Sequence, residues 1–314
     1  MRVLNLVTTE TAEFFTQQVR KLSEAGIGST TLAVPGEFSP DETESRSIRQ
    51  YARFYTTVLR ESLGDYDIVH ANFGLTGPHA LAQPVRPVVL SLWGTDLLGR
   101  YSAVSKLCAR LADAVVVMND EMAGLLDVDC HVIPHGVDLE RFAPTHQTEA
   151  QTELGWSTTD HHVLFPYPPG RAVKNYPRAE RIVDAVDDAL DDAVELHVLT
   201  GIPHQRMPVY MNAADCLLLT SKREGSPNSV KEALACDLPI VSTAVGDVAQ
   251  RLDGVTPSYV CRTDEEFVDC LVDVLERGVR SNGREAAREV SVVRTNERLR
   301  AVYGEVLDAR SGSV

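Results

Sequence analysis

Short apolar runs recur between residues 3 and 118 and are separated by segments with helical periodicity. Residues 3–7 form the first run, and Phe15, Val19 and Leu22 then follow at spacings of four and three, which is typical of an amphipathic helix. Each apolar run has the length of a buried strand. The pattern predicts a parallel sheet covered by helices. Its expected strands are residues 3–7, 30–34, 67–70, 87–92 and 114–118.

The same alternation resumes after a polar stretch at residues 144–153, which we interpret as the link between two domains. A charged helical segment follows the last strand and spans about 284–307. The sequence therefore predicts two similar α/β domains in tandem, a first at 1–146 and a second at 147–283. Polar loops at the carboxyl ends of such strands are where ligands bind. The second set of expected strands is 163–165, 195–199, 215–219 and 239–242.

Composition narrows the class of protein. The 314 residues are 44% hydrophobic and 24% charged, and they contain no run of 18 apolar residues, so no membrane-spanning helix is expected. The net charge of −15 argues against general nucleic-acid binding, which needs clustered cations. The six cysteines are scattered without a C-x-x-C pair, which argues against a disulfide framework or a zinc site. The chain opens without the pattern of a signal peptide, so we expect a cytoplasmic protein.

The basic residues are strongly biased toward arginine. Only five of the 30 are lysines, namely Lys21, Lys106, Lys174, Lys222 and Lys231. An acidic, lysine-poor surface suits a salt-loaded cytoplasm, because salt screens the self-repulsion of the net charge. This favours a halophilic source, although a GC-rich genome would also produce the arginine bias.

The densest group of polar residues lies at 221–235, where a predicted strand leads through a short loop into a helix. We expect Ser226 to be the N-cap of this helix and Pro227 its first residue, because proline fits there without losing a bonded N–H. The free N–H groups at the start of the helix, next to Gly225, would then form a site for phosphate oxygens.

Two glutamates flank this predicted phosphate site. Glu232 lies within the helix, where a carboxylate can accept hydrogen bonds from the two vicinal hydroxyls of a ribose. Glu224, just before the helix, would face whatever group extends beyond the phosphates. The alternative is a surface acid at Glu224 and an acid at Glu232 that serves only the helix dipole.

A second loop, 168–175, follows the first strand of the second domain and contains two cations in a proline- and glycine-rich context. Arg171 could bind a pyrophosphate in bidentate fashion, and Lys174 could bind it as a point charge. The alternative for this loop is a solvated turn.

Residues 224–239, with Ala213-Ala214-Asp215 before them and Val245-Gly246-Asp247 after them, resemble the signature of the retaining glycosyltransferases of family 4, the group 1 glycosyltransferases. The resemblance is strongest from about 160 to 250. It implies the GT-B fold, in which two Rossmann-like, doubly wound α/β domains face each other across a cleft. The second domain would bind most of the sugar nucleotide, and the C-terminal helix, about 284–314, would return to the first.

The resemblance also implies roles for single residues. Glu224 and Glu232 match the family's E-x7-E pattern and would contact the donor sugar and the nucleotide ribose. Arg171 and Lys174 match the pair that neutralises the leaving diphosphate, so Arg171, Lys174 and Glu224 are the main catalytic candidates. The full set expected to bind the donor is Arg171, Lys174, Glu224, Gly225, Ser226, Asn228, Ser229, Val230 and Glu232.

The first domain departs from the family pattern. Its first strand–helix loop, 8–12, lacks the usual glycines, and Trp93 stands where many relatives place a histidine. The contribution of that histidine must be absent or come from elsewhere, and His70 and Asp96 are the candidates. The alternatives are a structural role at the strand end for His70, and a turn or helix-cap role for Asp96.

Four arginines, Arg46, Arg49, Arg53 and Arg60, fall within about 60° of arc if residues 46–60 are helical. Such a stripe in an acidic chain could hold an anionic membrane surface or a lipid-phosphate acceptor. The alternative is a solvated face that pairs with Glu42, Glu44 and Glu61.

The sequence therefore predicts an enzyme that transfers a sugar from a nucleoside diphosphate to a glycan, lipid-linked or small-molecule acceptor. We expect retention of configuration, no cofactor and no metal, and we interpret the D-x-D patterns at 65–67 and 127–129 as structural. We also expect a cytoplasmic location with peripheral contact at the inner membrane face. Two alternatives stay open: a catalytically silent sugar-nucleotide-binding subunit, and another enzyme on the same fold, such as an epimerase.

Overall fold

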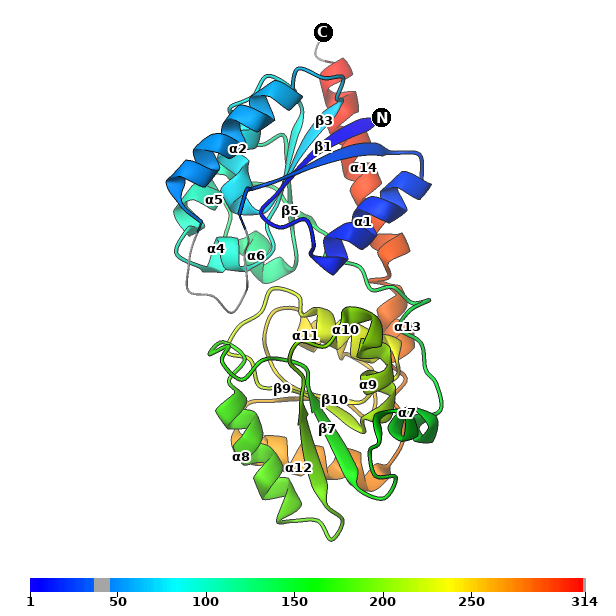
Figure 1. Ribbon diagram of the computed structural model, residues 1–314. Helices are drawn as coiled ribbons and strands as arrows, with labels where there is room; N and C mark the ends of the chain where they lie inside the picture. The colour runs from blue at the N-terminus through cyan, green and yellow to red at the C-terminus, as the bar shows by residue number, and fades with distance from the viewer. Residues whose placement is uncertain (37–45, 313–314) are drawn as a thin grey trace. The chain divides into compact units, whose positions relative to one another are not determined.

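The computed structural model describes residues 1–36 and 46–312, and it divides the chain into two compact units (Figure 1). The first unit contains Met1–Gly136 together with Val292–Val314, and the second contains Val137–Ser291. Each unit is a parallel sheet with connecting helices, so the predicted fold class is confirmed.

The described strands of the first unit follow the spatial order β2-β1-β3-β4-β5-β6, and all their pairings are parallel. These strands are β1 (Arg2–Val7), β2 (Gly28–Ala33), β3 (Ile68–Asn72), β4 (Val88–Ser91), β5 (Ala114–Val117) and β6 (His131–Val132). Its helices are α1 (Glu13–Glu24), α2 (Ile48–Glu61), the 3-10 turn η1 (Gly74–Thr76), α3 (Gly77–Leu81), α4 (Thr95–Leu98), α5 (Ser102–Ala109), α6 (Asp120–Gly124) and α14 (Val292–Ser311).

The strands of the second unit follow the order β11-β10-β9-β7-β8, also in parallel. They are β7 (His161–Phe165), β8 (Val194–Val198), β9 (Cys216–Leu219), β10 (Ile240–Thr243) and β11 (Tyr259–Cys261). The helices are α7 (Gln147–Leu154), α8 (Tyr176–Asp187), the 3-10 turn η2 (His204–Arg206), α9 (Met207–Ala213), α10 (Asn228–Ala235), α11 (Val248–Arg251), α12 (Asp264–Arg277) and α13 (Gly283–Arg288).

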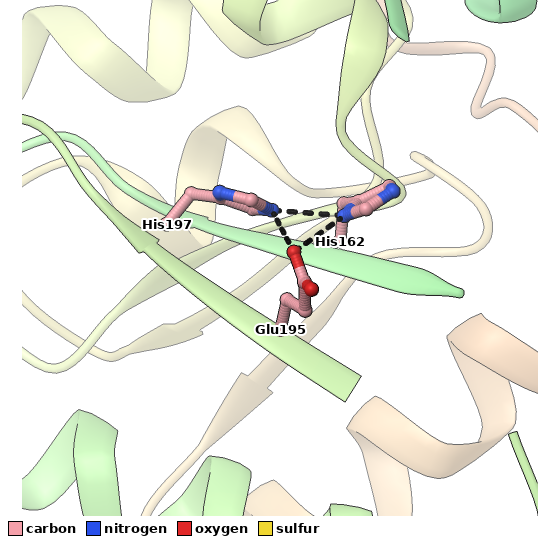
Figure 2. Close-up of side chains that lie close together, drawn as sticks. All are labelled: His162, Glu195 and His197. Atoms are coloured by element: carbon pink, nitrogen blue, oxygen red, sulfur yellow. Dashed lines mark hydrogen bonds and ion pairs between the residues drawn. The ribbon is translucent and has the colours of Figure 1, made fainter. Parts of the chain in front are cut away.

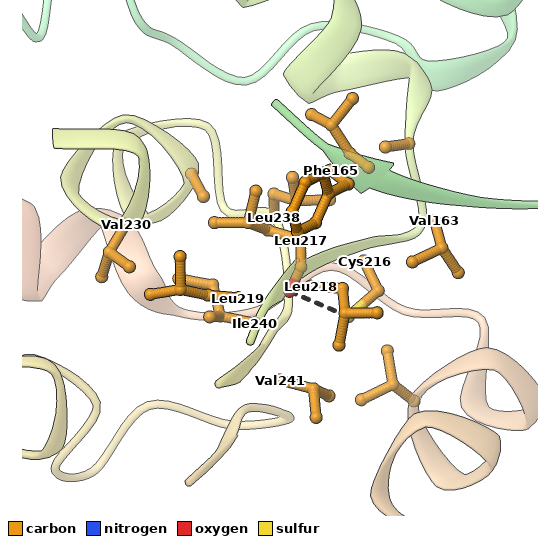
Figure 3. Close-up of a cluster of buried hydrophobic side chains, with 14 of the residues drawn as sticks. Val163, Phe165, Cys216, Leu217, Leu218, Leu219, Val230, Leu238, Ile240 and Val241 are labelled. Carbon is orange, nitrogen blue, oxygen red and sulfur yellow. Dashed lines mark hydrogen bonds between the residues drawn. The ribbon is translucent and has the colours of Figure 1, made fainter. Parts of the chain in front are cut away.

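Apolar side chains from both faces of the central strands build each core. In the second unit, β9 is fully buried along its length, and its leucines pack among Phe165 of β7, Ile240 of β10 and Val230 of α10 (Figure 3). A strand that is buried on both faces has a continuous apolar sequence, so the apolar runs predicted the central strands correctly. The two strands that the pattern missed, β6 and β11, are short and only partly buried edge strands.

The boundaries of the units differ from the predicted ones. Residues 137–146 belong to the second unit, where Phe142 is 1% exposed. The polar stretch 144–153, predicted to be a linker, overlaps α7. Helix α13 packs on α10 in the second unit, so the chain returns to the first unit only at Val292. From there α14 packs against α1 (Figure 1). Its Tyr303 side chain is buried in the first core.

Candidate functional site

Two loops of the second unit meet at the carboxyl ends of β7 and β9. From β7 the chain crosses to β8 on one side of it and then to β9 on its other side. The connections after β7 and β9 therefore run in opposite directions along the sheet, which makes the space between these strands a topological switch point. The two loops are tied together by two hydrogen bonds: the Lys222 amide donates to the carbonyl of Val173 over 2.9 Å, and the Thr220 hydroxyl donates to the carbonyl of Lys174 over 3.0 Å. The two motifs from the sequence therefore lie side by side.

Lys174 and Glu224 form a buried ion pair between these loops. The Lys174 ammonium lies 2.5 Å from Glu224 Oε1 and 3.7 Å from the centre of the Tyr167 ring, and the lysine is 5% exposed. Burial lowers the pKa of Lys174, and the carboxylate of Glu224 opposes that shift. A buried ammonium needs an anion close by. Lys174 is thus fixed as a positive charge at the mouth of the switch point.

Arg171 adds a second positive charge to this loop. Its charge lowers the pKa of Lys174 further and counteracts part of the rise that burial causes in the pKa of Tyr167. Among residues 1–36 and 46–312, no hydrogen-bond acceptor engages its guanidinium group. The guanidinium is consequently available to bind an anion.

The start of α10 has no side-chain cap. The helix begins at Asn228 with Pro227 as its N-cap, so the predicted N-cap role of Ser226 is wrong by one residue. The Ser226 hydroxyl instead donates to Asp247 Oδ2 over 2.9 Å and accepts from the Lys231 ammonium over 3.1 Å. An uncapped helix start leaves N–H groups that can bind phosphate oxygens.

The loop before α10 is fixed from behind by the segment after β10. Gly246 has φ +56°, and a Cβ atom there would lie 2.2 Å from the carbonyl oxygen of Gly225. Only glycine allows this approach. Asp247 then binds both Ser226 and the Arg251 side chain, 2.9 and 3.0 Å away. The Val245-Gly246-Asp247 motif thus positions the Gly225–Ser226 loop.

Lys231 makes the stability of this network depend on pH. It is 1% exposed, and burial lowers its pKa from 10.5 to about 8, with the carboxylate of Asp247 opposing the shift. Between pH 8 and 10.5 the unfolded chain holds this proton and the folded protein does not, so the free energy of unfolding rises with pH. We expect the stability of the wild type, measured relative to Lys231→Met in urea, to rise from pH 7.5 to 10. The same comparison with Lys222→Met, an exposed lysine, should stay flat, and a flat result for Lys231 would contradict the shift.

Glu232 pairs with a histidine that the sequence analysis missed. His204 Nε2 lies 2.7 Å from Glu232 Oε1, and its Nδ1 lies 3.2 Å from the Arg141 guanidinium. Glu232 is thereby held in one orientation within the second unit. His204 lies 28 residues from Glu232, in the short connection from β8 to α9, and no motif marks it.

His70 and Asp96 lie inside the first unit, with all their side-chain polar atoms hydrogen-bonded. His70 is 0% exposed, and its two ring nitrogens lie 2.7 Å from the hydroxyls of Tyr303 and Ser91. Asp96 is 1% exposed and accepts from four backbone amides, those of Gly74, Trp93, Gly94 and Leu97. The structure therefore favours the structural alternatives for both and gives their catalytic candidacy no support.

Trp93, which follows β4 of the first sheet, belongs to an aromatic cluster. Its ring meets Phe14 edge-on at 4.9 Å and His135 at 5.3 Å, and Phe14 stacks on His135 at 3.8 Å. Beside this cluster lies a cavity of about 950 Å³ whose apolar walls include Tyr51, Phe73, Leu75, Trp93 and Tyr101. Phe73 has φ 122°, a strained conformation for a non-glycine residue. Such strain at a cavity wall is typical of a ligand site.

The predicted arginine stripe is only partly helical. Arg46 precedes α2, where its guanidinium contacts Thr9 and the carbonyl of Gly36, and it lines the cavity. Arg49, Arg53 and Arg60 are exposed, and within the part of the chain that is described they form no ion pair. Glu42 and Glu44 lie outside the described residues, and Glu61 accepts from Tyr66. The buried face of α2 is formed by Phe54 and Val58, and Ile48 at its start is 88% exposed.

The acidic D-x-D patterns have structural partners. Asp67 accepts from the Arg2 amide over 2.7 Å, and Asp127 pairs with Arg110 over the same distance.

Among the described residues, no helix is long and apolar enough to cross a membrane.

This arrangement of two parallel, Rossmann-like sheets is the GT-B architecture of many glycosyltransferases. The fold is shared with sucrose-phosphate synthase from Thermosynechococcus elongatus at a TM-score of 0.75 and 16% identity, covering 98% of this chain and 100% of that one. It is also shared with Anabaena HepE, solved in complex with UDP-glucose, at a TM-score of 0.71 and 16% identity, covering 97% and 100%.

Two family models match separate parts of the chain. Residues 11–141 match Glycosyltransferase Family 4, and residues 174–277 match Glycosyl transferases group 1. The chain belongs to this family, the group 1 glycosyltransferases of family 4.

Curated relatives agree with this assignment at low identity. A D-inositol 3-phosphate glycosyltransferase from Actinosynnema mirum is 27% identical, over 88% of this chain and 82% of the relative. TuaC of Bacillus subtilis (strain 168), assigned to teichuronic acid biosynthesis, is 26% identical over 58% of this chain, and the match spans 54% of TuaC.

Proposed function

We propose that this protein transfers a sugar from a nucleoside-diphosphate sugar to a hydroxyl acceptor, with retention of configuration and without a metal in the reaction. The observation that carries the proposal is the buried Lys174–Glu224 pair, which lies at the switch point. Lys174 shares its loop with Arg171, and Glu224 lies in the loop that leads to the uncapped start of α10. A fixed positive charge next to free helix N–H groups matches the charge of a diphosphate.

Each part of the donor then has a counterpart in the second unit. Arg171, Lys174 and the N–H groups at the start of α10 bind the diphosphate. Glu232, held by His204, binds the ribose hydroxyls, and Glu224 reaches the transferred sugar. HepE, which shares the fold, was solved with UDP and with UDP-glucose, which supports a nucleotide sugar as the ligand class.

The chemistry requires stabilisation of a leaving group. When the bond between the sugar and the diphosphate breaks, negative charge builds on the phosphate oxygens, and preorganised cations and N–H groups lower the energy of that state. Lys174 is held in position by Glu224 and Tyr167, so little reorganisation of this cation is needed during the reaction. Together, Lys174 and Arg171 supply the charge that a metal supplies in other transferases.

The cavity in the first unit suggests the acceptor. Its aromatic and aliphatic walls suit an apolar group, and Arg46 at its edge suits an anion such as a phosphate. The exposed Arg49, Arg53 and Arg60 on α2 extend this positive surface. We therefore favour a lipid-linked acceptor, with peripheral contact at the cytoplasmic face of a membrane. The acidic, lysine-poor composition favours a salt-rich cytoplasm.

A thermal-shift panel of UDP, GDP, ADP, CMP and dTDP in high-salt buffer tests the donor site. A ligand at 100 times its Kd adds about 2.7 kcal/mol to the free energy of unfolding. We expect one nucleotide to raise the Tm of the wild type and of the control Glu276→Ala, an exposed glutamate of α12, but not that of Glu232→Ala. If no nucleotide raises the Tm of the wild type, the donor site is wrong.

The nucleotide found in this way identifies the sugar donors to assay for transfer. Formation of a glycoside from the donor and a lipid-linked acceptor supports the proposal. Tight binding without transfer to any acceptor would instead favour the silent binding subunit.

A further inference from the structure

Two histidines and a glutamate cluster on β7 and β8 of the second sheet (Figure 2). His162 Nδ1 lies 2.8 Å from His197 Nε2 and 3.8 Å from Glu195 Oε2, and His197 Nε2 lies 3.4 Å from the same oxygen. Three potential metal-binding atoms thus converge on one point. The proposed sugar transfer uses none of these residues.

The strand register explains why these residues meet. In the parallel pair β7–β8, His162 is opposite Glu195, and Leu164 is opposite His197. Because side chains alternate along a strand, Glu195 and His197 project from the same face of β8. His162 and Glu195 are each the second residue of their strand, so the cluster lies at the amino ends. Lys174 and Glu224 lie in loops that follow the carboxyl ends of β7 and β9, at the other end of the strands.

The surroundings orient both imidazole rings. His162 Nε2 lies 2.7 Å from the carbonyl oxygen of Ser157, which can only accept, so the neutral ring carries its proton on Nε2 and a lone pair on Nδ1. Such a bond from the distal nitrogen is the usual support for a metal-binding histidine. The Trp156 ring stacks on His197 at 3.5 Å, with 12° between the planes.

We propose that His162 Nδ1, His197 Nε2 and Glu195 bind a zinc ion, with a fourth position open to water. Ligand atoms at zinc bond lengths of about 2.0–2.1 Å in a tetrahedron lie about 3.3 Å apart. The separation of 3.4 Å between His197 Nε2 and Glu195 Oε2 already matches this value, and that of 3.8 Å between His162 Nδ1 and Glu195 Oε2 is slightly long. The separation of 2.8 Å between His162 Nδ1 and His197 Nε2 corresponds to an N–H···N hydrogen bond. Zinc would replace this hydrogen bond, with the proton of His197 moving to Nδ1.

Exposure of the three side chains suits the entry of an ion. His162 is 0% exposed, His197 16% and Glu195 52%, so the site is dry on the histidine side and open on the glutamate side. A bound ion would link the edge strand β8 to β7, and through His162 to the Trp156–Ser157 turn. Its role is therefore to stabilise the edge of the sheet and not to take part in sugar transfer.

Calorimetric titration of ZnCl₂ into the EDTA-treated, thiol-reduced full chain tests the site. We expect one ion per chain, and a loss of affinity of at least roughly 10- to 100-fold in His197→Gln and in Glu195→Gln. Glu195 is half exposed, so its replacement should leave the fold intact. The matched control His161→Gln, the preceding residue of β7, faces the other side of the sheet and should bind as the wild type does.

Two further readouts distinguish this site from the cysteines. Co²⁺ bound here should lack the thiolate charge-transfer absorption that cysteine ligands produce. Because Trp156 stacks on His197, zinc should also change tryptophan emission in the wild type and not in Glu195→Gln. If zinc does not bind, or binds equally to all three variants, the cluster is only a hydrogen-bonded histidine pair.

Discussion

Replacing Lys174 with alanine should weaken binding of a nucleoside diphosphate by about 1.5–3 kcal/mol, roughly a 10- to 100-fold rise in Kd. The ammonium is 5% exposed and positioned by Glu224 and Tyr167, so in the wild type it meets the phosphates without prior reorganisation. Its removal also leaves the Glu224 carboxylate, only 15% exposed, without its counter-ion and repelling the ligand. Isothermal titration with the nucleotide from the thermal-shift panel measures the change.

Lys222→Ala is the matched control for this prediction, since Lys222 is an exposed lysine that follows β9. Its hydrogen bond to the 168–175 loop comes from its backbone amide. The Kd of Lys222→Ala should stay within about twofold of the wild-type value. If Lys174→Ala does not fold, Lys174→Met keeps the side-chain stem against Tyr167 and removes only the charge. Unchanged affinity in Lys174→Met would overturn the diphosphate assignment of the loop.

Replacing Arg284 with alanine should lower the free energy of unfolding by about 3–5 kcal/mol. Its guanidinium donates to the carbonyl oxygens of Leu139 and Phe142, each over 2.7 Å, and to that of Ala235 at the end of α10. Hydrogen bonds from a charged donor are stronger than neutral ones. Loss of the side chain leaves these carbonyls without that donor. Urea unfolding measured by circular dichroism gives the change.

Arg288→Ala serves as the control for Arg284, because Arg288 is 61% exposed and pairs with the exposed Glu285. Exposed pairs contribute little, so its stability should change by less than about 1 kcal/mol. Equal effects of the two substitutions would contradict a special role for Arg284. A second test is ligand binding: Arg284 fixes the carboxyl end of α10 and leaves its amino end free for the donor, so the variant should also bind nucleotide less tightly.

Arg280 and Arg284 act together on the carboxyl ends of α9 and α10. Arg280 donates to the carbonyls of Met211 and Ala214 at the end of α9, and to that of Cys236 just after α10. Positive charge at a helix carboxyl end is favourable, because unpaired carbonyls give that end a partial negative charge. Arg280 and Arg284 thus provide hydrogen-bond donors for the carboxyl ends of α9 and α10.

Local sequence determined most of the fold and the main elements of the proposed donor site. Central strands are buried on both faces, so their apolar runs stand out, and all nine predicted strands are present. Glu224, Glu232, Arg171 and Lys174 follow strands at the carboxyl edge of one sheet, so their strand–loop–helix context already brought them together. The predicted helix start near Pro227 is off by one residue, because the Ser226 side chain bonds Asp247, 21 residues away, in place of the helix amides.

Long-range contacts decided the rest, and no local pattern encodes them. The hydroxyl of Tyr303 hydrogen-bonds one ring nitrogen of His70, although the two residues are 233 positions apart in the sequence. This contact gives His70 a structural role. The side chain of Phe142 packs in the second core, which moves the domain boundary, and Arg284 binds its carbonyl from 142 residues away. The register of β7 against β8 brought His162 to His197. Periodicity and propensity act over a few residues, whereas these partners are chosen by packing of the whole unit, so only the tertiary structure reveals them.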